Sequence, residues 1–404
     1  MLANLFAAAI FVNQTTPNPS EALSKIQQFR TAELAKDPKN TTEAFRTKIA
    51  QDSKLLAEEA LIAFNLQTVG AEDCLAWMNL LLIAERYAFI PATFDKYLTT
   101  DPPQSSRSAA ITILLESYLL SKNYGQAISK LDEIPAVHPM DAPNFVRASG
   151  EYAVHRPDPM SPEDAIAFLN RQLQKIISPN TVEETRSQAI AIANFYSAKA
   201  EIEFLDSNQI AGNASLSEGL ADPRLSEDEK NSIIRTRNRL NLPGSLAPEI
   251  VSDKSIGQYS NLASHRGKVV VINFLANWSL YSHFNFPALR KIHDDYKSQG
   301  VELLSVTQFY GYIENDFSLE ENDELNRMKS FATDQKINWP IVFSNLSSQV
   351  DYGVNALPYT VLIDKKGIVR KIMSGYDPAS IDTFRKEIEI AIKEPAELPP
   401  ASGG

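Results

Sequence analysis

Cysteine is almost absent from this chain of 404 residues, and Cys74 is the only one. A disulfide within the chain is therefore excluded, and so is a metal site built from several cysteines. Cys74 lies in a run of helical character, residues 71–86, where a lone thiol usually behaves as a small buried hydrophobic side chain. The five histidines are scattered and form no i, i+4 pair of the kind that holds a metal. We expect neither a metal nor any other cofactor.

A basic surface and a membrane-spanning segment are also missing. The chain carries 39 basic and 50 acidic side chains, a net charge of −11, which argues against nucleic acid as a partner because phosphate binding needs lysine and arginine. The apolar run at residues 2–12 is shorter than the ~20 residues that span a bilayer, so the protein is not expected to be membrane-spanning. A hydrophobic content of 44 % and a charged content of 22 % are typical of soluble globular proteins, and the length predicts two or three domains.

The apolar run at the N-terminus has the features of the hydrophobic region of a signal peptide, and residues 1–18 are interpreted in that way. An Asn/Thr/Pro-rich stretch follows it, as near a cleavage site, but no lysine or arginine precedes it and no small-x-small site follows it. A hydrophobic N-terminal helix packed on the core is the alternative. The first interpretation places the protein in the periplasm or cell envelope of a bacterium, and the second leaves it in the cytoplasm.

Residues 19–242 are predicted to form an all-α domain built from helical pairs. Apolar residues recur at three- and four-residue steps, and alternating β-branched residues are missing. Three helix starts are recognisable from their capping patterns: Ser161, which is followed by proline and two acids, and the capping boxes Thr181–Glu184 and Ser226–Glu229. Proline-rich stretches, for example residues 101–103, divide the run into pairs.

One of these pairs resembles a tetratricopeptide repeat. Residues 109–120 form its first predicted helix and residues 123–135 its second, with Tyr124 near the start, Ala127 in the interior and a proline at the end. No regular 34-residue period extends beyond this pair, so a plain helical bundle is the alternative to an irregular solenoid of such repeats. A solenoid would offer a concave face to a peptide.

The pattern changes after Gly244, and residues 245–395 are predicted to form an α/β domain. Short apolar runs rich in β-branched residues alternate with amphipathic helices, which indicates a parallel βαβ unit followed by a hairpin. The predicted strands are residues 267–274, 301–307, 359–363 and 369–374. The predicted helices are residues 287–299, residues 318–334 with a capping box at Ser318–Glu321, and residues 378–393, and residues 396–404 are predicted to be a flexible tail.

Three motifs stand out in this α/β part: Gly267–Trp278, Phe286–Leu289, and Val354–Asp364, in which Leu357–Pro358 precedes a strand. Together with the order of elements they resemble the thioredoxin-like fold, in the TlpA/ResA-type and redoxin (AhpC/TSA-like) branch of exported bacterial proteins. The resemblance implies a cis proline beside the redox motif, with backbone groups of the preceding residue open to an extended partner. The expected fold is thus a TPR-like all-α domain followed by an α/β thioredoxin-like domain.

The sulfur chemistry of that family is missing from the motif. The resemblance places the two redox cysteines at Ser279 and Ser282 and the acidic proton shuttle at Asn285. A serine hydroxyl cannot form a mixed disulfide, because the attacking group must be a thiolate stabilised by the helix N-terminus. Serine at position 279 has a structural explanation as the N-cap of the next helix. Ser282 and His283 are not expected to form a catalytic pair, since successive residues of a helix point in different directions, and no catalytic residue is predicted.

The segment 310–324 is longer and more acidic than a minimal thioredoxin-like fold requires. It is interpreted either as a lid beside the motif or as a solvated loop that leads into a helix, whose first turn favours acidic residues.

From these observations we expect a redox-inactive thioredoxin-like protein that binds a protein or a peptide. The predicted binding groove consists of Trp278, Ser279, Asn285, Leu357 and Pro358. Two alternatives are kept: thiol or peroxide chemistry carried out with a partner's cysteines, and a scaffold that acts through its helical repeats. The sequence predicts neither the oligomeric state nor the identity of the partner.

Overall fold

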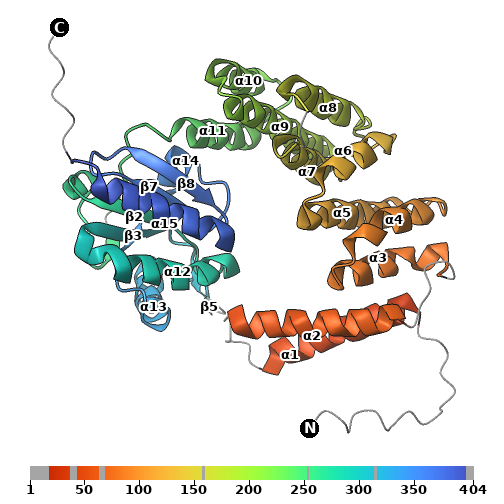
Figure 1. The fold of residues 1–404 in the computed structure, drawn as a ribbon, viewed down its shortest axis with the longest axis horizontal. Helices are drawn as coiled ribbons and strands as arrows, with labels where there is room; N and C mark the ends of the chain where they lie inside the picture. Colours follow the sequence, from red (N-terminus) through yellow and green to blue (C-terminus); the bar gives the residue numbers. More distant parts are fainter. Residues whose placement is uncertain are drawn as a thin grey trace. The chain divides into compact units, whose positions relative to one another are not determined.

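The computed structural model describes residues 18–36, 43–62, 69–156, 160–252, 254–313 and 316–396. The chain divides into two compact units, residues 1–191 and 192–404, drawn as ribbons in Figure 1. The signal peptide and the flexible tail predicted from the sequence lie outside the described residues, apart from residues 18 and 396. Among the described residues, no helix is both long enough and apolar enough to cross a bilayer.

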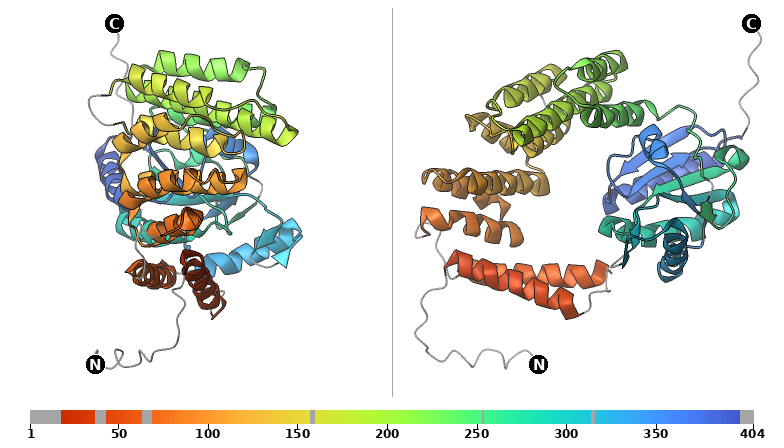
Figure 2. Two further views of the ribbon diagram at one scale, coloured as in Figure 1. Left: turned by 90° about the vertical axis from the view of Figure 1, so that its right-hand side faces the viewer. Right: turned by 180° about the vertical axis from the view of Figure 1, so that it is seen from behind.

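The first unit is built from helices, as the sequence predicts, and neighbouring helices pack against one another (Figure 2). The predicted cap at Ser161 is present: its Oγ accepts a hydrogen bond from the N–H of Asp164 (3.1 Å). The helices are α1 (Pro19–Lys36), α2 (Glu43–Ile62), α3 (Cys74–Ile83), α4 (Ile90–Leu98), α5 (Gln104–Ser121), α6 (Tyr124–Glu133), α7 (Ala142–Val154), α8 (Pro162–Gln174) and the first part of α9 (Val182–Leu205).

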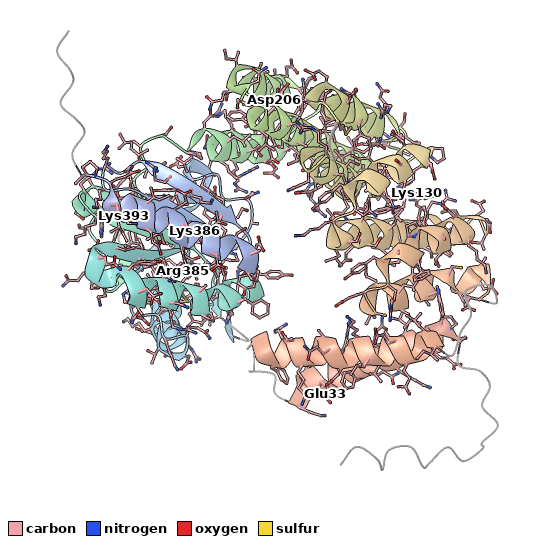
Figure 3. All side chains as sticks on the ribbon, viewed as in Figure 1. Glu33, Lys130, Asp206, Arg385, Lys386 and Lys393 are labelled. Carbon is pink, nitrogen blue, oxygen red and sulfur yellow. The ribbon has the colours of Figure 1, made fainter. Side chains whose placement is uncertain are left out.

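The two helices that resemble a tetratricopeptide repeat form α5 and α6, which pack against each other. Asn123 caps α6, because its side-chain oxygen accepts a hydrogen bond from the N–H of Gln126 (3.4 Å). Ala127 is fully buried. Lys130, labelled in Figure 3, pairs with Asp95 of α4 (2.5 Å). The helical pair is therefore present, and its assignment to the tetratricopeptide class stays a prediction.

The lone cysteine, Cys74, lies at the start of α3 and is fully buried. Its thiol donates a weak hydrogen bond to the carbonyl oxygen of Gly70 (3.4 Å). Burial raises the pKa of the thiol, because a thiolate is poorly solvated away from water. Cys74 is therefore the small buried side chain predicted from the sequence, and not a reactive thiolate.

The second unit begins within α9 and continues with α10 (Gln209–Ala221) and α11 (Glu227–Asn241). The predicted capping box at the start of α11 is formed, with Ser226 and Glu229 satisfying each other's backbone N–H groups. Helical structure gives way to a mixed sheet after α11, close to residue 242, whereas the two compact units divide earlier, within α9. Helices α10 and α11 therefore belong to the same compact unit as the sheet.

A six-stranded sheet forms the centre of the second unit, in the order β1-β6-β3-β2-β7-β8. Strands β6, β3 and β2 run parallel, and β7 is antiparallel to both β2 and β8, as predicted for a βαβ unit followed by a hairpin. The strands are β1 (Lys254–Ile256), β2 (Val269–Phe274), β3 (Val301–Thr307), β6 (Ile341–Phe343), β7 (Tyr359–Ile363) and β8 (Val369–Ser374). A separate hairpin pairs β4 (Tyr312–Ile313) with β5 (Asp316–Phe317).

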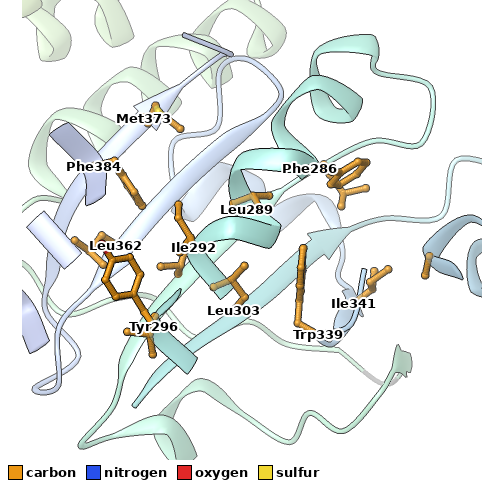
Figure 4. Close-up of a cluster of buried hydrophobic side chains, with 14 of the residues drawn as sticks. Phe286, Leu289, Ile292, Tyr296, Leu303, Trp339, Ile341, Leu362, Met373 and Phe384 are labelled. Carbon is orange, nitrogen blue, oxygen red and sulfur yellow. The ribbon is translucent and has the colours of Figure 1, made fainter. Parts of the chain in front are cut away.

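Each face of the sheet has its own hydrophobic core. Helices α12 (Leu280–Tyr296), α13 (Glu321–Asp334) and α15 (Pro378–Lys393) cover one face, where Phe286, Trp339 and Phe384 are buried (Figure 4). Residues 242–262 and the end of α14 (Leu346–Asp351) cover the other face, where Tyr352 is fully buried. Each large apolar side chain removed from water contributes roughly 1.5–3 kcal/mol, so the two cores fix the strands on which the motif residues stand.

Helix α12 begins before the predicted bounds 287–299, at the start that the interpretation of Ser279 as an N-cap indicates. It starts at Leu280, one residue after its N-cap Ser279, and Pro287 lies inside the helix instead of starting it. A proline within a helix removes one i→i−4 hydrogen bond and costs ~3 kcal/mol. Here burial of Phe286 and Leu289 on either side offsets that cost, since these side chains pack into the core only when the helix is continuous.

Helix α13 begins later than predicted, and the capping box expected at Ser318–Glu321 is wrong. The helix starts at Glu321 with Glu320 as its N-cap. Ser318 has a φ of +59°, in the left-handed region, whereas an N-cap residue has an extended backbone. Strands β1 and β6 were also missing from the prediction, because three residues are too few to show a periodic pattern.

Helix α11 packs directly against the α/β part at Gly353, just after α14. Gly353 has a φ of +67°, and a Cβ at this position would lie 2.4 Å from the backbone nitrogen of Arg239 and 2.5 Å from the carbonyl oxygen of Arg235. Nearby, the side-chain amide of Asn238 donates to the carbonyl oxygen of Val350 (2.8 Å). Only glycine fits both the backbone angle and the close approach of the helix.

We predict that Gly353→Ala loosens α11 from the α/β part, and Gly244→Ala is the matched control. Gly244 also has a positive φ, +84°, but nothing lies within 4 Å of a Cβ placed there. Both variants carry the backbone strain of alanine in the left-handed region, about 1–2 kcal/mol. Gly353→Ala adds a steric clash, and overpacking adds a further ~1–3 kcal/mol. Urea unfolding measures the difference, and hydrogen exchange of residues 227–241 should accelerate in Gly353→Ala alone. Equal effects of the two substitutions would contradict this account.

Candidate functional site

The carboxyl end of β2 positions the motif loop, which carries Trp278 and Ser279 and leads into α12. All six residues of β2 are buried, and the chain leaves the strand into the loop that ends at Ser279. Strand β7 is antiparallel to β2, with Tyr359 paired to Phe274. This register brings Leu357–Pro358, which enters β7, beside the start of the motif loop. The peptide bond between these two residues is cis.

Ser279 is the N-cap of α12, as its structural explanation predicts. The side chain is buried, and its Oγ accepts a hydrogen bond from the N–H of Ser282 (3.3 Å). A helix N-terminus leaves its first N–H groups without partners, and a serine oxygen satisfies one of them. The hydroxyl is therefore used by the backbone of its own helix.

Ser282 faces the interior and is fully buried. Its Oγ has no hydrogen-bond partner in the part of the chain that the structure describes. His283 is directed elsewhere: its Nε2 lies 2.8 Å from the carbonyl oxygen of Asn277, and its ring meets that of Phe331 edge-on at 5.4 Å. Ser282 and His283 therefore form no nucleophile–base pair.

Asn285 lies one turn further along α12 and is buried within a small polar network. Its side-chain amide donates to Oδ1 of Asn273 (3.2 Å) and to Oγ1 of Thr360 (3.4 Å), and the hydroxyl of Thr360 donates to the same Oδ1 (3.4 Å). These contacts join α12, β2 and β7. An amide does not exchange a proton near neutral pH as a carboxylate does, so the network holds the elements together without serving as a proton shuttle.

Trp278 is the exposed member of the predicted groove. Its side chain is 52 % exposed, and its ring meets that of Tyr310 edge-on, with centroids 5.8 Å apart. Leu357 is half-buried and packs against the core under β2 and β7, while Pro358 is buried. Trp278 and Ser279 lie on one loop, the pairing of β2 with β7 brings Leu357–Pro358 to the start of that loop, and Asn285 contacts Asn273 of β2 and Thr360 of β7.

The acidic segment 310–324 forms the β4–β5 hairpin and the start of α13. Glu324, which is 1 % exposed, accepts hydrogen bonds from the N–H groups of Tyr310 (2.9 Å) and Gly311 (2.7 Å). The side-chain amide of Asn277 donates to the carbonyl oxygen of Tyr312 (3.1 Å). The start of the hairpin is thus tied to the motif loop. Burial also raises the pKa of Tyr310 to about 12, so its phenol stays neutral at physiological pH.

Sequence reasoning did not identify most of the aromatic side chains that lie around the start of α12 and the β4–β5 hairpin. Tyr281, which is 58 % exposed, meets Phe284 edge-on at 6.0 Å, and Phe284 meets Tyr376 at 5.8 Å. We call Tyr281, Phe284 and Tyr376 the helix cluster, and Trp278, Tyr310 and Tyr312 the insert cluster. The spacing of Tyr281 and Phe284 on one helix face is visible in the sequence, but their exposure depends on how α12 packs on the sheet.

Comparison with known proteins places this site in a family. Residues 243–372 match the AhpC/TSA family. The thiol-disulfide oxidoreductase ResA of Geobacillus thermodenitrificans is 33 % identical over 133 residues, which are 33 % of this chain and 69 % of that protein. ResA of Bacillus subtilis is 32 % identical over 133 residues, which are 33 % of this chain and 67 % of that protein. The crystal structure of the thioredoxin domain of a thiol-disulfide oxidoreductase from Bacteroides vulgatus is 20 % identical, with a TM-score of 0.30, and covers 36 % of this chain and 97 % of that one.

The matched residues include the sheet up to residue 372 of β8, helices α12, α13 and α14, and the motif loop, but not α15. They include both serines of the motif and the cis proline. Through this C-terminal thioredoxin-like domain, whose relatives are ResA-type proteins, the chain belongs to the AhpC/TSA family.

Proposed function

We propose that the thioredoxin-like domain binds a protein or peptide at the motif surface and does not exchange thiols with disulfides. The observation that carries the proposal is the contrast between two neighbouring residues: Ser279 is buried and engaged as a helix cap, whereas Trp278 beside it is 52 % exposed. Trp278 is thus open to contact with a partner, whereas position 279 carries no thiol that could react with one.

Three elements of thiol chemistry are missing together. Attack on a disulfide needs a thiolate, and Ser279 carries a hydroxyl that already accepts the N–H of Ser282. Resolution of a mixed disulfide needs a second thiol, and Ser282 offers another hydroxyl. Proton transfer needs a titratable group, and Asn285 carries an amide. Cys74, the one cysteine of the sequence, is fully buried, so its thiol is not exposed to attack a disulfide.

Binding requires none of these groups. The backbone of Leu357 precedes an ordered strand and stands beside the motif loop, where an extended segment of a partner can add main-chain hydrogen bonds. Trp278 supplies a large, rigid apolar surface next to it, of the kind that dominates binding energy at protein interfaces. The predicted groove consists of Trp278, Ser279, Asn285, Leu357 and Pro358. In this proposal Trp278 and the backbone of Leu357 form its contact surface, and the three buried residues support them.

A second candidate function is a scaffold that binds through the helical unit. A cavity of about 430 Å³ in that unit supports it, since a cavity of this size suits an apolar side chain or a small ligand. The cavity lies among α2, α3 and the turn before α4, and its lining residues are Glu58, Leu61, Ile62, Trp77, Leu81, Arg86 and Phe89. We place both candidates in the periplasm or cell envelope, on the signal-peptide pattern of residues 1–18.

The two serines should respond differently to removal of their hydroxyls. Ser279→Ala removes the cap of α12 and is expected to lower the free energy of unfolding by about 1 kcal/mol. Ser282→Ala removes a buried hydroxyl without a partner among the described residues and should leave stability unchanged or raise it. Denaturant unfolding of the two variants measures this contrast. A loss in Ser282→Ala as large as that in Ser279→Ala would show that its hydroxyl has a partner after all.

Restoring the two sulfurs should restore redox chemistry. The double variant Ser279→Cys/Ser282→Cys is expected to catalyse the reduction of insulin by dithiothreitol, because the helix N-terminus that stabilises a thiolate is still in place. The variant Ser279→Cys/Ser282→Ala is the matched control, since it has no resolving thiol. The unmodified protein should remain at background, and activity clearly above background would reject the proposed function.

Partner recovery should separate the two candidate functions. Proteins recovered from a cell-envelope extract by the full chain are compared with those recovered by Trp278→Ala and by Phe89→Ala, which remove exposed aromatic side chains from the motif and from the helical unit. The proposal predicts that Trp278→Ala loses its main partner, because a tryptophan at the centre of an interface often contributes about 2 kcal/mol or more. Loss with Phe89→Ala and none with Trp278→Ala would favour the scaffold.

A further inference from the structure

A crevice opens in the sheet of the thioredoxin-like domain at a place that the proposed function does not use. Strands β3 and β6 are parallel neighbours, with Thr307 paired to Phe343 at their carboxyl ends. The chain that leaves β3 leads to α13 on one face of the sheet, whereas the chain that leaves β6 leads through α14 to Tyr352 on the other face. Open α/β sheets bind ligands where the connections from neighbouring strands part in this way.

A cavity of about 530 Å³ lies at this point, within the range of ~300–1,000 Å³ that is typical of small-molecule sites. Its lining comes from residues that follow β3 and β6, from the start of α13 and from the chain that enters β1, and it includes Val251, Lys254, Phe309, Glu321 and Leu346. Trp278 is not among the described residues that line it. The cavity is therefore distinct from the motif surface.

One wall of the cavity combines an aromatic pair with an ion pair. The ring of Phe309 stacks on that of Phe343, with centroids 4.4 Å apart. The ammonium group of Lys254 lies 5.1 Å from the centroid of Phe309 and 2.5 Å from a carboxylate oxygen of Glu321. Both contacts favour the charged form of Lys254. A cation and an anion thus stand side by side at a defined place in the lining.

The charged groups and two apolar side chains remain open to a ligand. The side chains of Lys254 and Glu321 are 34 % and 62 % exposed, so each can accept a further partner without leaving the other. Val251 and Leu346 are 66 % and 52 % exposed. An apolar group that covers them removes apolar surface from water, which favours binding.

The two adjacent charges select the class of ligand. A carboxylate alone would pair with Lys254 but would also face Glu321, and an amine alone would pair with Glu321 but would face Lys254. In both cases like charges meet, which lowers affinity. A ligand with both charges next to each other compensates both groups. A free α-amino acid has this arrangement, whereas a peptide carries its two terminal charges at opposite ends.

We infer that the crevice binds a free α-amino acid with an apolar side chain. Its carboxylate pairs with Lys254, its ammonium group pairs with Glu321, and its side chain packs on Val251 and Leu346. This site goes beyond the proposed function, and binding of a protein or peptide at the motif surface does not depend on it.

Isothermal titration calorimetry with the full chain tests the inference. The probes are L-leucine, 4-methylpentanoate, which is leucine without its amino group, and 3-methylbutylamine, which is leucine without its carboxylate. We expect saturable binding of L-leucine and a Kd for each analogue that is at least about tenfold higher, because each analogue loses one charge-assisted contact and gains one repulsion. Trp278→Ala should leave the Kd for L-leucine unchanged.

Two variants should weaken L-leucine and shift the preference in opposite directions. Lys254→Met keeps the apolar stem on Phe309 but removes the cation, so it should favour 3-methylbutylamine over 4-methylpentanoate. Glu321→Gln keeps the shape but removes the anion, so it should favour 4-methylpentanoate. A variant that merely fails to fold cannot produce opposite preferences. Lys268→Met is the matched control, because Lys268 also pairs with a glutamate, Glu302, but at the opposite end of the sheet, and it should leave the Kd unchanged.

Three outcomes would overturn the inference. The first is the absence of saturable L-leucine binding up to millimolar concentration. The second is binding of 4-methylpentanoate or 3-methylbutylamine as tight as that of L-leucine, since the site would then recognise a single charge. The third is binding of L-leucine that Lys254→Met and Glu321→Gln leave unchanged, since the ligand would then bind elsewhere. Each of these results leaves the proposed function standing, because Trp278 takes no part in the site.

Discussion

Strand β2 is the element on which the site depends. It lies between β3 and β7 with all six residues buried, so neither its depth nor its register can shift without disturbing both cores. Its carboxyl end delivers the motif loop, and its pairing of Phe274 with Tyr359 sets the proline turn beside that loop. Phe274 and Tyr359, which are 85 positions apart in sequence, thus meet through the hydrogen-bond ladder of one strand.

The N-terminus of α12 would stabilise a thiolate at position 279, and a serine hydroxyl at the same position caps the helix equally well. A helix N-terminus lowers the pKa of a thiol because its N–H groups and dipole favour negative charge. With a hydroxyl at that position, the same N–H groups find a neutral acceptor, and Ser279 satisfies one of them. The buried amide network of Asn285, Asn273 and Thr360 likewise keeps the contact between α12 and the sheet without a titratable group. The packing of the site therefore needs neither a sulfur nor a titratable group at these positions.

The sequence predicts a strand or helix correctly where the residues of that element alone carry its hydrophobic pattern. Strands β3, β7 and β8 match their predicted bounds, and so does helix α15, because each has a clear hydrophobic period and a turn at its end. Tertiary packing decides the rest: Pro287 sits inside α12 although proline usually starts or ends a helix, and the three-residue strands β1 and β6 exist only through pairing. The anchoring role of Glu324 was equally hidden, since an acid in the first turn of a helix normally faces solvent.

The close fit of Gly353 against α11 affects how this protein can be divided or recombined. The family match begins at residue 243, yet the backbone of α11 lies against the turn that leads to the proline loop. A fragment cut at the family boundary would lose the Asn238 contact to Val350 and expose the surface that the helix covers. Exchange of the domain between proteins would therefore have to carry α11 with it, because the helix and the thioredoxin-like domain pack as one module.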